Sequence, residues 1–187
     1  MTAPVIAVFG LSGVGKSWLI GRYAQHGSVV HVQGSQLLRE AKAELLGETV
    51  TSDELRRGAV LDNQALLIQA FARVRETATK PIIFDGHCVV DDGTQLLEIP
   101  TEVIASLAVS HLVLVEGPPN LIIQRRQDDP TRVRPLRTED EIFHHQQHAK
   151  FMCLLYHQKL GLPLDVIAAG DEKAFADALS AATPGRS

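Results

Sequence analysis

One short segment near the start of the chain carries residue types that bind phosphate. It reads Gly10-Leu11-Ser12-Gly13-Val14-Gly15-Lys16-Ser17 and satisfies the pattern G-x-x-x-x-G-K-[ST]. Its glycines allow the backbone to curl, so that successive N–H groups point inward at phosphate oxygens. The positive end of a following helix adds to this attraction. The segment therefore predicts a loop that binds the polyphosphate of a nucleotide.

The side chains of this loop have separate expected roles. We expect Lys16 to reach the β and γ phosphates of ATP, and the Ser17 hydroxyl to coordinate Mg²⁺. Trp18 follows directly and is expected to pack beneath the loop rather than to stack on a base. The residues predicted to bind the nucleotide through this segment are Ser12, Gly13, Val14, Gly15, Lys16, Ser17 and Trp18.

An acidic residue further along the chain is suited to complete the Mg²⁺ site. Asp85 follows the apolar run Ile82-Ile83-Phe84, so it stands at the end of a predicted strand. Its carboxylate is expected to be the second Mg²⁺ ligand; the alternative is a turn aspartate before Gly86. His87 is close enough to face the same cleft and to orient water or an acceptor. An ordinary hydrogen-bonded loop histidine is the other interpretation.

Arginines are concentrated in one polar segment. Five of the twelve arginines fall within thirteen residues, and these five are Arg125, Arg126, Arg132, Arg134 and Arg137. Guanidinium groups match the oxygens of a phosphoryl group in transfer. A loop over residues 128–138 is therefore predicted to close over the nucleotide and exclude water. The alternative is a solvated loop whose arginines pair with neighbouring Asp and Glu side chains.

Short apolar strands alternate with helical stretches along the chain. The predicted strands cover residues 5–9, 29–32, 81–84, 111–115 and 164–167. The predicted helices cover residues 16–26, 35–46, 61–78, 101–106, 118–127, 138–160 and 172–181, with a further short piece at 51–54. This alternation predicts an α/β fold in which helices cover both faces of a five-stranded parallel sheet, a three-layer sandwich.

Three local features of the helices are also expected. Ser35 is expected to cap its helix. The helix at 61–78 is apolar around much of its circumference, which indicates burial between layers. Thr138 and Glu141 have the spacing of a capping box at the start of a long helix.

The overall composition indicates an ordinary globular protein, and we expect one domain over residues 1–187. Hydrophobic residues make up 45 % and charged residues 21 %, which excludes a disordered chain. The net charge of −4 disfavours general binding to nucleic acid. No membrane span and no signal peptide are expected. The two cysteines, Cys88 and Cys153, form no disulfide framework, so a reducing, cytoplasmic location is expected.

Three segments together resemble the nucleoside monophosphate kinases, of which adenylate kinase is the best known. The first is the phosphate loop. The second, residues 31–41, is similar to the segment that ends in a helical arginine gripping the monophosphate, and Arg39 matches that arginine without a gap. The third, Phe84-Asp85-Gly86, resembles the family's "DGFPR" turn. It continues as His87-Cys88-Val89, so the family's second acceptor arginine is missing. The turn and the arginine-bearing lid resemble archaeal-type and nuclear adenylate kinases.

The resemblance implies a P-loop NTPase fold and transfer of the ATP γ-phosphoryl group to a nucleoside monophosphate. It implies a helical acceptor-binding insertion near residues 33–78 and a lid near residues 128–138. The residues implied to act in transfer are Lys16, Asp85, Arg126, Arg134 and Arg137. The residues implied to face the acceptor are Ser35, Arg39, Gln64 and His87.

The arginines have distinct implied positions. Arg39 would hold the acceptor phosphate, and Arg125 or Arg126 would lie against the donor nucleotide. Arg134 and Arg137 would reach the transferring phosphoryl group. Archaeal-type relatives also suggest self-association of the chain.

Two other functions stay open at the level of sequence. A small-molecule kinase of the gluconate or shikimate kind would phosphorylate a hydroxyl group rather than a phosphate. An ATPase acting as a switch or assembly factor would use His87 to place water, and its partner would be a protein or ribosomal particle.

Overall fold

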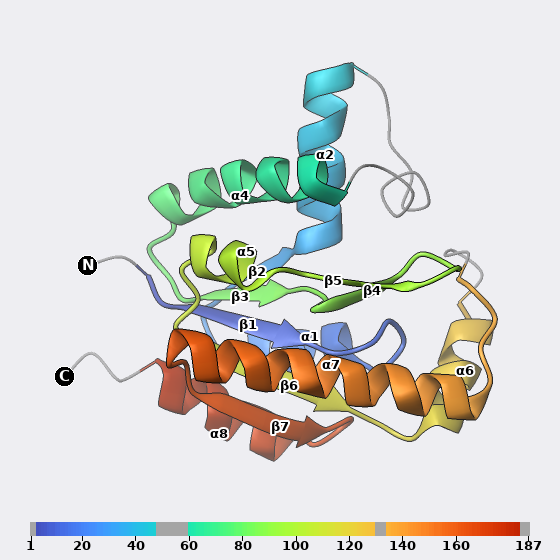
Figure 1. Ribbon diagram of the computed structural model, residues 1–187. Helices are drawn as coiled ribbons and strands as arrows, with labels where there is room; N and C mark the ends of the chain where they lie inside the picture. The colour runs from blue at the N-terminus through green and yellow to red at the C-terminus, as the bar shows by residue number, and fades with distance from the viewer. Residues whose placement is uncertain (1–2, 48–59, 130–133, 184–187) are drawn as a thin grey trace.

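The fold is a three-layer α/β sandwich built on a parallel sheet. A computed structural model describes residues 3–47, 60–129 and 134–183 (Figure 1). The five-stranded sheet has the order β2-β3-β1-β6-β7, and every neighbouring pair is parallel. The strands are β1 (Val5–Phe9), β2 (Val30–Gln33), β3 (Ile82–Asp85), β6 (His111–Glu116) and β7 (Leu164–Ala168). The predicted sheet is confirmed, and the bounds of its strands differ from the predicted ones by at most one residue.

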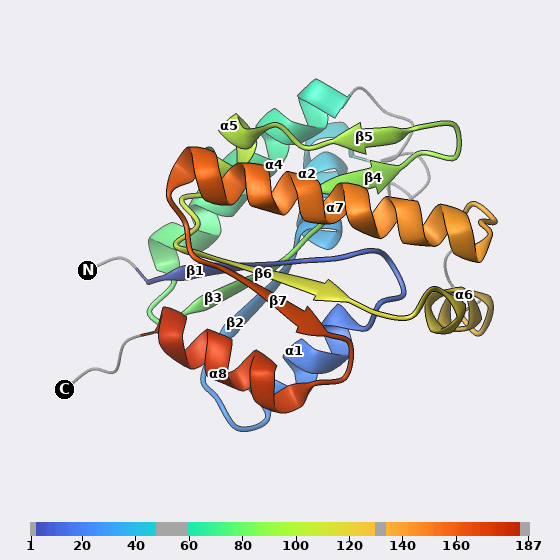
Figure 2. The same ribbon diagram turned by 60° about the horizontal axis from the view of Figure 1, so that its bottom comes forward.

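Helices cover both faces of this sheet (Figure 2). On one face α1 packs against α8, and on the other face α5 packs against α7. Outside the second face α2 packs against α4, and α6 lies beyond the carboxyl ends of the strands (Figure 1). The helices are α1 (Lys16–Ala24), α2 (Gly34–Leu46), α4 (Val60–Thr77), α5 (Thr101–Ser106), α6 (Pro119–Gln127), α7 (Glu139–Leu160) and α8 (Glu172–Ala182).

Strand β3, beside the central strand β1, ends in a charged residue at the edge of the core. All residues of β1 and β3 are buried, including Asp85 at the end of β3. Such strands have no polar face, because helices cover both sides of the sheet. Asp85 pairs in register with Val8 and Gln33, so it lies at the carboxyl edge where the phosphate loop leaves β1. A buried carboxylate at this position needs polar partners.

Two expectations about helices are wrong. Ser35 does not cap its helix, because α2 already begins at Gly34, with Gln33 as the N-cap residue and no side-chain cap bond. The predicted helix at 61–78 is α4, and it is not buried between layers. Ala70 and Phe71 are buried, whereas Arg73 on another side of the helix is exposed. The reason is that one side of α4 packs on the sheet, where Phe71 contacts Phe84 of β3, while the side that carries Arg73 is exposed.

The expected capping box is confirmed at the start of α7. The Thr138 hydroxyl accepts a hydrogen bond from the Glu141 N–H, and the Glu141 carboxylate accepts one from the Thr138 N–H. The predicted helical piece at 51–54 and the side chain of Arg132 lie outside the described residues.

The expectations from composition concerned the two cysteines and a membrane span. Cys88 and Cys153 are both free and buried, with their Sγ atoms 3.8 Å apart. Among the described residues, no helix has both the length and the apolar character needed to cross a membrane.

The structure also contains an antiparallel hairpin that was not predicted. It consists of β4 (Val89–Asp91) and β5 (Leu96–Glu98). In its turn, Oδ1 of Asp92 accepts hydrogen bonds from the N–H groups of Gln95 and Thr94, each 2.8 Å long. These bonds stabilise the carboxylate and lower the pKa of Asp92 to about 2. The run Asp91-Asp92-Gly93-Thr94 is itself a turn signal and could have revealed the hairpin.

Phe84 at the end of β3 is held between two glycines, and this packing leads to a stability prediction. A Cβ added to Gly86 would lie 2.6 Å from Cε1 of Phe84, and one added to Gly34 would lie 2.8 Å from Cζ. The Phe84 ring also packs edge-on against Phe71, with centroids 5.2 Å apart, so it has little room to move. We expect Gly86→Ala to lower the free energy of unfolding by about 1–3 kcal/mol, measured by urea denaturation.

Gly21→Ala is the matched control for this prediction. A Cβ added to Gly21 in the middle of α1 meets nothing within 4 Å. That substitution should leave the free energy of unfolding unchanged or raise it by up to about 1 kcal/mol, because alanine favours the helix. Equal destabilisation by both substitutions would contradict the packing argument.

Candidate functional site

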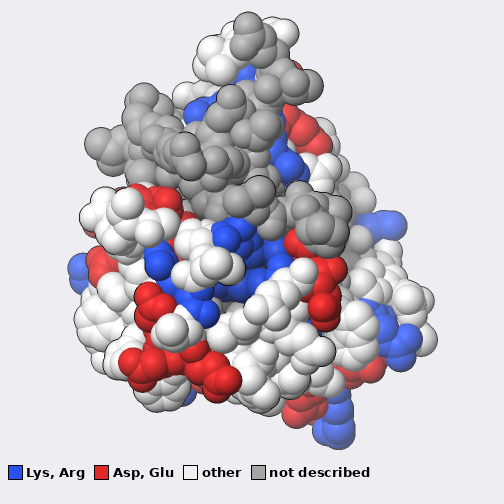
Figure 3. All heavy atoms as spheres, turned by 90° about the vertical axis from the view of Figure 1, so that its right-hand side faces the viewer, with Lys and Arg blue, Asp and Glu red and all other residues white. Residues whose placement is uncertain are grey.

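Two adjoining cavities lie at the carboxyl edge of the sheet. The first, which we call the phosphate cavity, has a volume of about 380 Å³. All but one of the predicted nucleotide-binding residues line it, namely Ser12, Gly13, Gly15, Lys16, Ser17, Trp18 and Arg125. Val14 does not line it, because its side chain is fully buried in the core. Lys and Arg side chains gather in a hollow at the centre of this face of the molecule (Figure 3).

The phosphate loop and the first turn of α1 form one wall of the phosphate cavity. Gly15 is the N-cap residue of α1, and its φ of 109° is left-handed, which residues with a Cβ rarely adopt. An added Cβ would also lie 3.1 Å from Nη1 of Arg125. No side chain caps α1, so the N–H groups of its first turn are directed at the cavity. This arrangement is suited to bind an anion.

Four side chains meet where the loop faces the end of β3. The Lys16 ammonium lies 3.7 Å from Oδ1 of Asp85 and donates a 2.9 Å hydrogen bond to the carbonyl of Gly10. The Ser17 hydroxyl donates a 2.9 Å hydrogen bond to Oδ2 of Asp85. His31 on β2 places Nε2 3.5 Å from the same oxygen. Lys16 and Asp85 are only 6 % and 9 % exposed, so their charges interact with little screening by water.

These partners keep Asp85 ionised. Burial alone would raise the pKa of its carboxyl group, but the hydrogen bond with His31 and the charges of Lys16 and His87 outweigh burial. Together with the Ser17 hydroxyl they lower the pKa of Asp85 to about 2. A carboxylate and a hydroxyl side by side are hard oxygen donors, which Mg²⁺ prefers. The residues present therefore fit the predicted Mg²⁺ site.

His31 is a member of this cluster that the sequence analysis did not assign to the site. It lies on β2 in register with Ile83 of the neighbouring strand, two residues before the pairing of Gln33 with Asp85. The available signal was a polar residue inside an otherwise apolar strand that was predicted to be buried.

Three of the predicted arginines contact the phosphate loop. Arg125 donates a 2.7 Å hydrogen bond to the carbonyl of Val14, and Arg126 donates one of 2.9 Å to the carbonyl of Ser12. Nε of Arg134 donates to the Ser12 hydroxyl over 2.9 Å, and its Nη2 donates to Asp129 over 2.7 Å.

The remaining nitrogen of Arg134 marks this cluster as a place for an anion. Nη1 of Arg134 is buried and has no hydrogen-bond partner among the described residues. Burial and the neighbouring charge of Arg134 lower the pKa of Arg126 to about 10. Two guanidinium groups held together away from water destabilise each other, and an anion between them would relieve this cost.

Arg137 has different partners. It forms a two-bond ion pair with Asp91 of β4, with Nη2–Oδ1 and Nε–Oδ2 distances of 2.9 and 3.1 Å. Nη2 also donates to the carbonyl of Gly93 over 3.0 Å. The hydrogen bonds with Asp91 raise the pKa of Arg137 above its ordinary value. The described contacts of Arg137 thus anchor the end of the predicted lid to the β4–β5 hairpin rather than to the phosphate loop.

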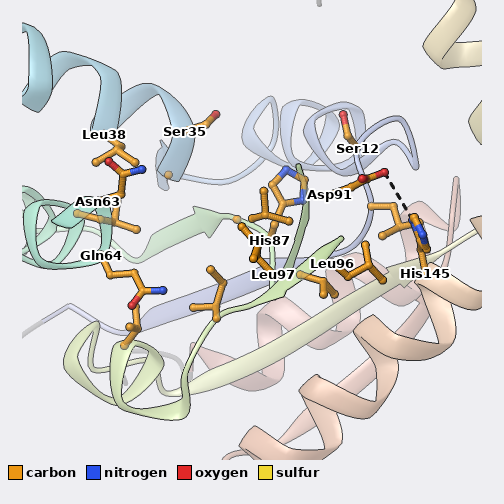
Figure 4. Close-up of a pocket in the computed structure, with 18 of the residues that line it drawn as sticks. Ser12, Ser35, Leu38, Asn63, Gln64, His87, Asp91, Leu96, Leu97 and His145 are labelled. Atoms are coloured by element: carbon orange, nitrogen blue, oxygen red, sulfur yellow. Dashed lines mark ion pairs between the residues drawn. The ribbon is translucent and has the colours of Figure 1, made fainter. Parts of the chain in front are cut away.

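The second cavity, which we call the apolar cavity, has a volume of about 250 Å³. Most of its lining is apolar, including aliphatic side chains of the β4–β5 hairpin. Asn63 and Gln64 lie at one end, Asp91 and His145 at the other, and His87 between them (Figure 4). The two cavities meet at five shared lining residues, which are Leu11, Ser12, Ser35, His87 and Arg134.

Of the four residues predicted to face the acceptor, three line the apolar cavity and one does not. Ser35, Gln64 and His87 line the apolar cavity. Arg39 on α2 is half-buried and lines neither of the two cavities. His87 places Nδ1 2.9 Å from the carbonyl of Gly10. A carbonyl oxygen only accepts, so Nδ1 of His87 carries a proton and donates this hydrogen bond.

A family model described as "AAA domain" matches residues 9–143. The match begins at the last residue of β1 and includes the phosphate loop, Asp85 and all five clustered arginines. It covers more than half of the chain. The chain belongs to this AAA domain family.

Similarity to known proteins extends over nearly the whole chain. The adenylate kinase of Thermococcus kodakarensis is 27 % identical over 180 residues, which cover 94 % of this chain and 91 % of that protein. The adenylate kinase of Thermococcus onnurineus is 29 % identical over 181 residues, with the same coverage, 94 % and 91 %. The crystal structure of shikimate kinase from Bacteroides thetaiotaomicron superposes with a TM-score of 0.58 at 16 % identity, covering 95 % of this chain and 97 % of that one. The AAA domain therefore has the fold of P-loop kinases.

Proposed function

We propose that this protein is an ATP-dependent phosphotransferase that moves the γ-phosphoryl group of ATP to a nucleoside monophosphate. The observation that carries the proposal is the junction of the two cavities at Ser12, His87 and Arg134. One cavity is built to hold a polyphosphate and the other can hold an acceptor. A group that passes from one cavity to the other would cross this junction.

The donor side rests on the phosphate loop. Its N–H groups and the Lys16 ammonium would hold the β and γ phosphates, and Ser17 and Asp85 would hold Mg²⁺. When bound, Mg²⁺ neutralises charge on the phosphate oxygens. Lys16 is held by Gly10 and Asp85 before nucleotide binds, so it is already at the wall of the cavity. This pre-placement lowers the cost of ordering a long, flexible side chain.

The acceptor side rests on the apolar cavity. Arg126 and Arg134 line the apolar cavity, and Arg134 also lies at the junction, so their buried guanidinium groups would stabilise the negative charge that develops during transfer. The aliphatic walls exclude water, which would otherwise compete with the acceptor. The amide of Gln64 lies at the far end, where it would bind a polar edge of the acceptor. The acceptor attacks directly, so no protein nucleophile is needed. The adenylate kinase names of the relatives agree with a nucleoside monophosphate as acceptor.

The test is a turnover assay with ATP, Mg²⁺ and a panel of nucleoside monophosphates, in which nucleoside diphosphate products are separated and quantified. The expected result is diphosphate formation that depends on both ATP and one or more monophosphates. ATP consumption at the same rate with and without every acceptor would overturn the proposal and favour an ATPase.

A second candidate function is phosphorylation of a hydroxyl group on a small molecule. Two observations favour it. Arg39 lines neither cavity, and His87 lies at their junction. A hydroxyl group, unlike a phosphate, must lose a proton as it attacks, and a neutral histidine can take that proton.

Arg39→Ala distinguishes the two candidates. If a monophosphate is bound through Arg39, the variant should raise KM for that monophosphate about 10- to 100-fold, because a charge-assisted hydrogen bond is lost. Arg73→Ala, at a position 75 % exposed on α4, is the control and should leave KM unchanged. Unchanged KM for every monophosphate in Arg39→Ala would favour the hydroxyl acceptor.

Three further features stay predictions. These are the single-domain organisation, the acceptor insertion and lid at residues 33–78 and 128–138, and self-association of the chain.

A further inference from the structure

Trp18, the only tryptophan, does not pack beneath the phosphate loop as expected. Its side chain is 52 % exposed, although it stands in the first turn of α1 and lines the phosphate cavity. The buried residues of α1 are Lys16, Leu19 and Ile20, so the indole lies on the exposed side of the helix. A large aromatic side chain loses favourable free energy when it is left in water. The core therefore does not explain why an indole stands at this position.

The orientation that a bound nucleotide must have brings its nucleoside toward this indole. The terminal phosphate has to reach the junction with the apolar cavity, beside Ser12 and Arg134. The phosphates nearer the nucleoside then lie along the start of α1, because the loop N–H groups hold the α and β phosphates while Lys16 reaches the outer ones. Trp18 and Arg125 are among the residues that line the phosphate cavity but not the apolar cavity, and both lie at the start of α1, Trp18 in its first turn and Arg125 against Gly15. A nucleoside that extends from the phosphates along the start of α1 would therefore pass these two residues.

The two residues differ in how they are held. Arg125 is fixed by its 2.7 Å hydrogen bond to the carbonyl of Val14, and its guanidinium group lies against Gly15. Trp18 offers a large flat apolar surface that faces solvent. A base has two flat faces that prefer an aromatic surface to water, and stacking on an indole needs no particular pattern of donors and acceptors.

We propose that Trp18 is the platform on which the base of the donor nucleotide stacks, and that it makes donor binding tolerant of the identity of the base. The inference rests on the proposed function only in taking a nucleoside triphosphate as the donor. Stacking would bury the exposed indole on ligand binding. It would add affinity for a nucleotide without affecting the phosphates.

The first test uses the emission of this single tryptophan in the wild-type chain, titrated in the presence of Mg²⁺. The ligands are ATP, GTP, CTP and inorganic tripolyphosphate. The three nucleotides should change the emission and bind with dissociation constants within about tenfold of each other, because stacking tolerates every base. Tripolyphosphate should bind without the same change. An equal emission change with tripolyphosphate and ATP would overturn the proposal.

The second test measures binding by calorimetry in variants. Trp18→Ala should weaken ATP binding at least about fivefold and leave the dissociation constant of tripolyphosphate unchanged, whereas Trp18→Phe should keep most of the ATP affinity. Phe143→Ala is the matched control, since Phe143 is 49 % exposed on α7 and lines neither cavity. Equal weakening of both ligands in Trp18→Ala, or weakening of neither, would overturn the proposal. These readouts need no phosphoryl transfer, so an inactive enzyme that still stacks ATP would refute the proposed function alone.

Discussion

Replacing Lys16 with methionine should lower kcat/KM for phosphoryl transfer by about 100- to 1,000-fold. Methionine keeps an unbranched side chain of similar length but removes the ammonium group at the wall of the phosphate cavity. A pre-placed positive charge in a poorly hydrated site is worth this much to a transition state that gathers negative charge. Because Lys16 is only 6 % exposed, water that enters the variant would compensate little for the lost positive charge. The measurement is steady-state turnover with saturating Mg²⁺.

Two variants separate this effect from unfolding. Lys173→Met changes a lysine that is 88 % exposed on α8, and it should leave kcat/KM unchanged. Lys16→Arg keeps the positive charge beside Asp85, so it should stay folded, yet it should still lose activity because a planar guanidinium does not replace a compact ammonium. A Lys16→Met protein that is folded and retains more than a tenth of the wild-type kcat/KM would contradict the assigned role.

Asp85→Asn should lower kcat by about 100-fold and raise the Mg²⁺ concentration needed for half-maximal activity. The substitution keeps the shape of the side chain but replaces an anionic oxygen donor with an amide. In the wild-type protein the Ser17 hydroxyl donates to Oδ2 of Asp85, and in the variant it has no carboxylate beside it. Activity measured against Mg²⁺ concentration checks this prediction. An unchanged Mg²⁺ requirement would show that Asp85 does not contribute to the metal site.

The same substitution should change the pH dependence of stability. The pKa of Asp85 falls from 3.8, its ordinary value, to about 2 in the folded protein. The charged carboxylate therefore stabilises the fold above about pH 4, by about 2 kcal/mol, and this contribution is lost as pH falls from 4 to 2. The difference in free energy of unfolding between wild type and Asp85→Asn should shrink over that range in urea titrations. Asp177→Asn, at a position 67 % exposed, should show little difference at any pH.

The main elements of the fold follow from local sequence patterns. The central strands read as short apolar runs because helices bury both of their faces, and that pattern persists whatever surrounds it. The phosphate loop is likewise a local feature, since the conformation of Gly15 and the start of α1 are set within a few residues. The sequence therefore predicted the sheet, the loop and the position of Asp85 at a strand end, all of which the structure contains.

The partners of the charged side chains were decided only by the tertiary structure. Arg134 and Arg137 are three residues apart, yet one contacts Ser12 of the phosphate loop and the other Asp91 of the β4–β5 hairpin. His31 meets Asp85 because β2 lies beside β3. Ion pairs and hydrogen bonds act over a few ångströms, so they depend on which distant segments the fold brings together.

The exposure of Trp18 has the same origin. As a large aromatic side chain next to the phosphate loop, Trp18 was expected to pack beneath it, but the way α1 packs leaves the indole exposed at the phosphate cavity. The sequence by itself thus determined the sheet and the loop that binds phosphate, because these depend on the order of neighbouring residues. Which arginines reach that loop, what shape the apolar cavity takes and where the tryptophan faces depended on packing between segments far apart in the chain, which no local pattern records.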